Sequence, residues 1–237
     1  MRKNYWAKFE QENCYHIYNR CIDGLLLFKT PENYHFLLQK WEQYLGAYCS
    51  LYAYCLIPNH FHFLIKCKTP NEQIIEAIKQ EESNKARLYI KKEISLNTFL
   101  ESQFKRFFNS YVASFNKENE RRGSLLKAKF KRILIHDPAH FAHLLCYIHH
   151  NPIHHKMETT YDNWAHSSFN HYLKIIEPDH KLSPNSSKAR IASRTVFELF
   201  ANIQDVKGRF NFLQAHQDFL VNYREESVID AAYLGDE

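Results

Sequence analysis

Two histidines that stand two positions apart are the first candidates for chemistry. His60 and His62 lie in the run PNHFHFLIK, whose aromatic and β-branched residues favour a strand. Because side chains alternate along a strand, both imidazoles should lie on one face, with Phe61 and Phe63 on the other. Such a pair suits a divalent metal and leaves coordination positions open for a substrate oxygen. Histidines at this spacing are also common as structural residues, so the pair alone does not establish a metal site.

A tyrosine in the segment HDPAHFAHLLCYIHHNP is the second candidate. The apolar residues of this segment repeat at helical spacing and predict a buried helix face formed by Phe141, Leu144, Leu145 and Ile148. Tyr147 falls off that face, and His143 and Asn151 flank it at i−4 and i+4, so that a hydroxyl shares a stripe with polar groups. The alternatives are a tyrosine that only packs at a helix boundary and an asparagine that only ends the helix before Pro152.

Positive charge is concentrated in the middle of the chain. Residues 66–156 hold 17 Lys/Arg and 9 Asp/Glu, a local net charge of +8, although the whole chain carries only +5. Such a region attracts phosphate polymers, but it is equally consistent with a solvated helical face. The candidates for nucleic-acid contact are Lys105, Arg106, Arg121, Arg122, Lys127, Lys129, Lys131 and Arg132.

Other features narrow the class of protein. The six cysteines form no C-x-x-C pair, so we expect reduced, mostly buried thiols rather than a zinc finger. The cluster His149, His150, His154 and His155 has no cysteine partners and exceeds any single zinc site, so we interpret these histidines as donors near phosphate at most. No apolar run approaches the roughly 20 residues of a membrane span, and we expect a cytoplasmic protein.

The periodicity of the chain predicts the elements that must position these residues. The first half should contain a strand at 14–19, a helix from Thr30 to Gly46, strands at 51–57 and 61–67, and a polar helix opened by Thr69, Pro70 and Glu72. The second half should contain a helix from Leu100, a strand over 125–135 with one basic face, and a helix from Asp137 that ends before Pro152. The aromatic stripe Phe104, Phe107, Phe108, Tyr111 and Phe115 favours core packing over base stacking.

The order β-α-β-β-α-β-α predicts an α+β fold, a ferredoxin-like sandwich in which an antiparallel sheet carries helices on one face. We expect a catalytic domain over residues 1–175, a linker over 176–194 and a helical C-terminal extension over 195–237, because 178–193 is loop-like in composition.

Four ordered blocks, PNHFHFLIK, RRGSLLKAKFKRILI, YIHHNPIHHK and WAHSSFNHYL, resemble the REP-associated tyrosine transposases, which belong to the single-tyrosine HUH transposases. The resemblance runs from about Tyr15 to Leu173 and extends more faintly through TVFELFANIQDV. The family often has an aromatic residue and a glycine where this chain has Leu126 and Ala128, which affects the details of DNA contact and not the chemistry.

The resemblance implies a transposase-like enzyme that cuts and rejoins single-stranded DNA through a 5′-phosphotyrosine intermediate. Tyr147 would be the nucleophile, and His60, His62 and Asn151 would hold Mg²⁺ or Mn²⁺. The implied partner is single-stranded DNA with a hairpin from repeat elements, and a homodimer is left open. Two alternatives compete: a domesticated protein that binds repeat hairpins without mobilising them, and a metallohydrolase that does not use Tyr147.

Overall fold

The computed structural model describes residues 4–181, 189–204 and 208–223. Its centre is a four-stranded sheet with the strand order β2-β3-β1-β4, in which every neighbouring pair is antiparallel. The strands and the two long helices that connect them are β1 (Cys14–Arg20), α1 (Pro31–Tyr44), β2 (Cys49–Ile57), β3 (His60–Cys67), α4 (Leu96–Glu118) and β4 (Lys131–Ile135). The α+β fold and its order of core elements are therefore confirmed.

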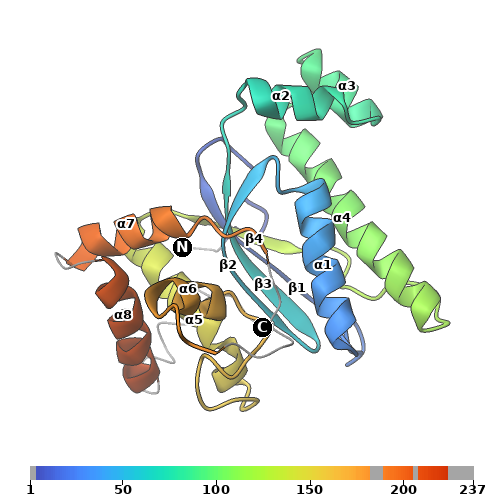
Figure 1. Cartoon of the computed structure of the whole chain (residues 1–237). Helices are drawn as coiled ribbons and strands as arrows, with labels where there is room; N and C mark the ends of the chain where they lie inside the picture. Colours follow the sequence, from blue (N-terminus) through green and yellow to red (C-terminus); the bar gives the residue numbers. More distant parts are fainter. Residues whose placement is uncertain (1–3, 182–188, 205–207, 224–237) are drawn as a thin grey trace.

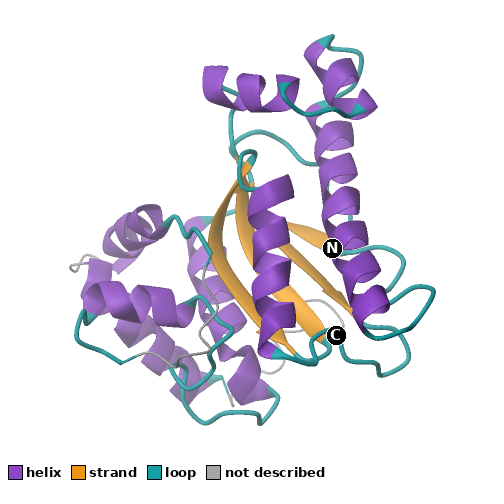
Figure 2. Cartoon of the chain, turned by 45° about the vertical axis from the view of Figure 1, so that its right-hand side comes forward, coloured by secondary structure: helices purple, strands orange, loops and turns teal. Residues whose placement is uncertain are grey.

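One face of the sheet is covered by α1 and α4, which lie side by side in both views (Figures 1 and 2). Phe61 and Phe63 of β3 point into this layer and contact Phe108 of α4 and Trp41 of α1, respectively. The aromatic stripe of α4 is buried in the same core, as the helical spacing predicted. The α4 helix begins at Leu96, four residues earlier than expected, because Ser95 caps it by accepting from the Thr98 N–H.

Helices also cover the opposite face of the sheet, which the sequence prediction of a one-sided sandwich missed. The α5 helix (Pro138–His154) packs against β2 and β3, and around it lie α6 (Phe169–Ile176), α7 (Ser193–Gln204) and α8 (Gly208–Asn222) (Figure 1). A second hydrophobic core fills this layer, with Ala53, Cys55 and Leu64 from the sheet. The C-terminal helices thus complete the sandwich.

Three local predictions were wrong. The basic strand is confined to Lys131–Ile135, and the segment before it meets the end of β1 through the bridge between Cys21 and Leu126 and the hydrogen bond from the Lys127 N–H to the Arg20 carbonyl. The α5 helix continues through Pro152 to His154. The proline removes one helical hydrogen bond, but it is buried, and its tertiary packing keeps the last turn helical. The polar helix α2 (Glu72–Lys79) is capped by Asn71 rather than Thr69. The short helix α3 (Asn84–Ile90) follows it and lies beside the N-terminal end of α4 (Figure 1).

Segments from outside the sheet lie along both of its edge strands. At β4, the Arg132 N–H donates to the Tyr5 carbonyl at 2.8 Å, and the Ala7 N–H donates to the Arg132 carbonyl at 3.4 Å. At β2, isolated bridges join Cys55 to Ser167 and Leu51 to Ile191. We call residues 4–7 the N-terminal arm.

Within the described residues no helix is long and apolar enough to cross a membrane. The six cysteines are free thiols, five of them buried, as predicted. The proposed domain boundaries stay a prediction, and parts of the expected linker and extension (182–188, 205–207 and 224–237) lie outside the described residues.

Candidate active site

The four residues predicted from the two motifs come together between β3 and α5. His60 Nε2 lies 3.4 Å from Asn151 Oδ1, and the His62 ring meets the Tyr147 ring edge to face at 5.8 Å between centroids. Tyr147 and Asn151 stand one helical turn apart, and the Asn151 amide donates to the Tyr147 carbonyl at 3.2 Å, which turns its oxygen towards His60. A tyrosine, two imidazoles and an amide oxygen therefore share one location within a single chain.

Neighbouring polar groups orient both imidazoles. Asn59 Oδ1 lies 2.8 Å from His60 Nδ1, and because an amide oxygen only accepts, a proton on Nδ1 would leave the His60 Nε2 lone pair for a metal. His62 Nδ1 lies 2.9 Å from His16 Nε2, and a proton on Nδ1 would likewise leave the His62 Nε2 lone pair for a metal. His16 is a site residue that the sequence analysis missed. His16 and Tyr18 stand two positions apart on β1 and share a face of the sheet, as His60 and His62 do on β3. Because β1 pairs directly with β3, this spacing was the signal that could have identified His16.

These residues fit a divalent metal with an open coordination sphere. In the described part of the chain no three His, Cys, Asp or Glu side chains converge as a metal site. The candidate donors are instead the two imidazoles and the Asn151 amide oxygen, a mixed nitrogen and oxygen set that leaves positions for phosphate oxygens. The identity of the ion, Mg²⁺ or Mn²⁺ as the sequence resemblance implied, stays a prediction.

A cavity of about 210 Å³ opens beside the two histidines. Its wall carries His60 and His62 together with four cations, Arg20 of β1 and Lys127, Lys129 and Lys131 of the 127–131 segment. The other lining residues are Tyr18, Asn19, Asn59 and His155. The Asn19 amide holds the 127–131 segment in place by donating to the Lys127 carbonyl at 3.0 Å. Positive charge is thus placed next to the histidine pair. Arg20 and His155 were not predicted as site residues.

Tyr147 is more buried than its sequence position suggested. Its side chain is 2% exposed, and Asn151 is completely buried. The prediction that Tyr147 lies off the buried face of its helix was wrong, because α5 has the sheet on one side and α7 and α8 on the other. Tyr147 and Asn151 therefore face the sheet rather than solvent.

The predicted DNA-contacting residues divide into two groups. Lys105, Arg122, Lys127 and Lys129 are exposed, and Lys131 is half-buried. The other three have intramolecular partners: Arg132 is 5% exposed and paired with Glu101, Arg106 is paired with Glu81, and Arg121 donates to Asn116 Oδ1 and to the Ser124 carbonyl. Arg132 and Arg106 thus serve packing between elements, which residue type alone could not predict.

The histidines at the end of α5 also separate by environment. His149 contacts Ser168 Oγ and His216 Nε2, each at 2.7 Å, and burial lowers its pKa well below the usual value. The His143 ring lies 5.1 Å from Phe219 of α8. Both His149 and His143 contact helices on the side of α5 that faces away from the sheet. His155 alone of the predicted donor cluster lines the histidine cavity, with its ring 4.9 Å from that of His60.

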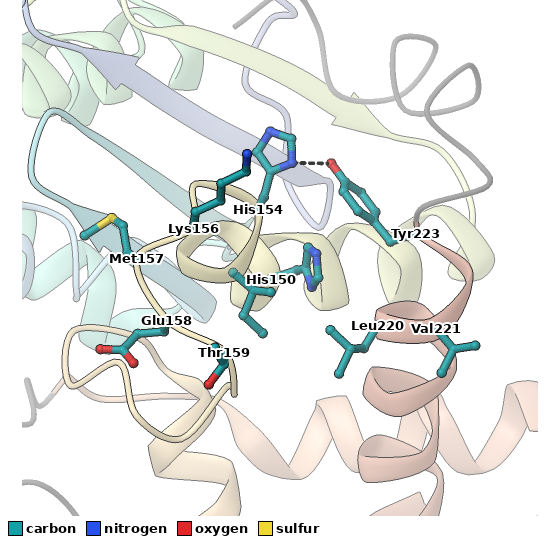
Figure 3. A pocket seen from close by; sticks show the side chains of 10 residues that line it. His150, His154, Lys156, Met157, Glu158, Thr159, Leu220, Val221 and Tyr223 are labelled. Atoms are coloured by element: carbon teal, nitrogen blue, oxygen red, sulfur yellow. Dashed lines mark hydrogen bonds between the residues drawn. The ribbon is translucent and has the colours of Figure 1, made fainter.

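A larger cavity of about 920 Å³ lies between the end of α5 and α8 (Figure 3). His154 and Tyr223 meet across it at 3.1 Å, and Leu220 and Val221 form an apolar wall. Its lining shares no residue with that of the histidine cavity. Size alone therefore does not mark the site that holds the predicted chemistry.

No protein-family model matches this chain. A protein of Haemophilus influenzae assigned to the REP-associated tyrosine transposases is 27% identical over 124 residues, which are 52% of this chain and 60% of that relative's length. A solved structure of a REP-associated tyrosine transposase bound to a REP hairpin matches with a TM-score of 0.50 and 13% identity, and the match covers 81% of this chain and 93% of that one. The sequence match confirms the resemblance to the REP-associated tyrosine transposases, and the structural match confirms the fold.

Proposed function

We infer, from this similarity to REP-associated tyrosine transposases, that the chain is a transposase-like enzyme that cuts and rejoins single-stranded DNA. The observation that carries the inference is the convergence of His60, His62 and Asn151 on Tyr147 within one chain. A protein that only bound DNA would have no need for a nucleophile beside a set of metal donors.

The chemistry that we propose is a transesterification. The Tyr147 hydroxyl attacks the scissile phosphorus, a Tyr–O–P bond forms, the P–O3′ bond breaks, and the strand is released with a free 3′-hydroxyl. The phosphodiester energy is kept in the 5′-phosphotyrosine link, so a 3′-hydroxyl can reverse the step and rejoin a strand. This reversibility suits recombination better than degradation.

His60, His62 and Asn151 would hold Mg²⁺ or Mn²⁺. When bound, the metal supplies a positive charge that stabilises the developing charge on the scissile phosphate and its leaving oxygen. Asn59 and His16 keep the two imidazoles oriented, and Lys127, Lys129 and Lys131 add fixed positive charge at the cavity wall.

We propose single-stranded DNA with a hairpin as the substrate. The basic wall of the histidine cavity supports a polyphosphate ligand, and the solved structure with the same fold is that of a protein bound to a REP hairpin. The hairpin would position the chain on its DNA, and the unpaired strand next to it would enter the cavity.

The test uses the full chain and single-stranded DNA from the flanks of its encoding locus, with Mn²⁺ or EDTA, resolved on a denaturing protein gel. We expect a metal-dependent covalent protein–DNA band in the wild type and its loss in Tyr147→Phe. Tyr44→Phe, which removes the same hydroxyl from α1 at a distance from the histidines, is the matched control and should keep the band. Cleavage that persists in Tyr147→Phe would instead indicate a hydrolase, and hairpin binding without cleavage would indicate a domesticated DNA-binding protein.

A further inference from the structure

The N-terminal arm presents an exposed tryptophan beside the basic segment. Trp6 is 55% exposed, whereas Trp41 is 1% exposed. The arm is held against β4 by main-chain hydrogen bonds on either side of Trp6, through Tyr5 and Ala7. The position of Trp6 is therefore fixed by the backbone, and its indole is not needed to hold the arm.

Trp6 lines a groove of about 620 Å³ that adjoins the histidine cavity. The two depressions share Asn19, Lys127 and Lys129 in their walls. Lys105 of α4 adds a further exposed cation to the groove, and the acidic residue in its lining, Glu101, is paired with Arg132. A strand that leaves the histidine cavity over Lys127 and Lys129 would enter this groove.

Cations already flank the aromatic rings of the arm. Lys129 Nζ lies 5.9 Å from the centroid of the Trp6 ring, and Lys131 Nζ lies 4.6 Å from that of Tyr5. An exposed aromatic ring next to lysines is an arrangement by which proteins bind unpaired nucleic acid, because the ring stacks on a base while the ammonium groups bind its phosphates. A base inside a duplex offers no free face for such a contact.

We propose that Trp6 is a stacking residue for an unpaired base of the DNA strand next to the cleavage site, with Lys127 and Lys129 on the flanking phosphates. This inference rests on the proposed function and names the part of the surface that holds the single strand. The arm would thereby distinguish single-stranded from paired DNA.

The test measures tryptophan fluorescence and affinity in EDTA, so that no cleavage occurs, with an oligothymidine strand and with a blunt hairpin that has no unpaired tail. We expect oligothymidine to quench the wild-type fluorescence, and Trp6→Ala to bind it roughly tenfold more weakly, within the range for loss of one stacked base. Trp6→Phe should keep most of the affinity but lose most of the quenching, because it preserves a ring while removing the exposed indole. Binding of the blunt hairpin should be equal in all three proteins.

A charge-matched pair of variants separates a phosphate contact beside Trp6 from general electrostatic attraction. Lys129→Gln should weaken oligothymidine binding, and Lys85→Gln, which removes an exposed charge from α3, should not. The inference is overturned if oligothymidine binds the wild type without quenching, or if Trp6→Ala binds it as tightly as the wild type, even while cleavage by Tyr147 is intact. Failure of the wild type to bind any single strand would overturn the proposed function as well. If Trp6→Ala does not fold, the quenching comparison with Trp6→Phe still decides the matter.

Discussion

Lys129 and Arg132 stand three positions apart in the same basic segment, yet their environments are opposite. Lys129 is exposed in the wall of the histidine cavity, whereas the Arg132 guanidinium is buried, paired with Glu101 and stacked 4.4 Å from the Phe9 ring. The charge on one is available to a phosphate, and the charge on the other is already used within the protein.

This difference leads to a paired prediction. Lys129→Ala should leave the free energy of unfolding within about 0.5 kcal/mol of wild type while lowering the slope of log affinity against log salt by about 0.7 on single-stranded DNA. Arg132→Met should leave that slope unchanged but destabilise the fold by about 1–2 kcal/mol, since Glu101 would lose its partner while remaining half-exposed to water. Urea unfolding and salt titrations of DNA binding measure both quantities. An altered salt slope for Arg132→Met would contradict its assignment as a packing residue.

At the residue scale, spacing in the sequence predicted which site residues come together better than it predicted how deeply they are buried. The alternation of β3 placed His60 and His62 together, and helical spacing placed Tyr147 over Asn151, because both depend only on local geometry. The buried state of Tyr147 could not be predicted in this way, since it depends on α7 and α8, some 50 to 75 residues later in the chain.

At the scale of elements, a chain of buried polar contacts fastens α8 to α5. His216 Nδ1 donates to the Phe212 carbonyl at 2.7 Å, its Nε2 meets His149 Nδ1 at 2.7 Å, and His149 Nε2 meets Ser168 Oγ. Burial lowers the pKa of His216 to about 4 and that of His149 well below its usual value. Both rings are therefore neutral in the folded protein at neutral pH.

The attachment of α8 should weaken in acid. An unfolded histidine gains a proton near pH 6.5, whereas His216 in the fold stays neutral until about pH 4. The unfolded state binds more protons between these values, so the free energy of unfolding should fall as pH falls from 6.5 to 4, by up to about 1.4 kcal/mol per pH unit for each histidine. Urea unfolding across this range measures the slope. His216→Gln should be less stable at pH 7.5 and show a shallower slope, and an unchanged slope would contradict the prediction.

Elements with strong local signals were predictable, and those that depend on distant partners were not. The β1, β2 and β3 strands and the α1 helix begin and end close to the positions expected from alternation, capping and Gly46. The stretch 125–130 alternates like a strand, and Leu125 and Lys127 do bond to Ile22 and Arg20, but a bend at 128–129 separates them from the short β4. Pro152 predicted a helix end because the packing that holds the last turn of α5 has no local signal.

At the scale of the whole molecule, the proposed ligands and nucleophile belong to one chain. We therefore expect Tyr147 to act with the His60 and His62 of its own subunit, which the sequence had left open. A mixture of Tyr147→Phe with a His60→Ala, His62→Ala double variant should form no covalent DNA adduct, whereas wild type diluted with Tyr147→Phe should form it in proportion to the wild-type share. A restored band in the first mixture would show that subunits exchange these residues. Whether the chain forms a homodimer is a separate prediction.

The two edge strands of the sheet become covered at different times during synthesis of the chain. The cover of β4 comes from residues 4–7, which are synthesised before that strand, but the cover of β2 comes from Ser167 and Ile191, made more than 100 residues after the strand itself. A nascent chain that has emerged only as far as β4 thus has one closed edge and one open edge. Until residue 191 leaves the ribosome, β2 is where such a chain can pair with another copy, and where a chaperone would have most to protect.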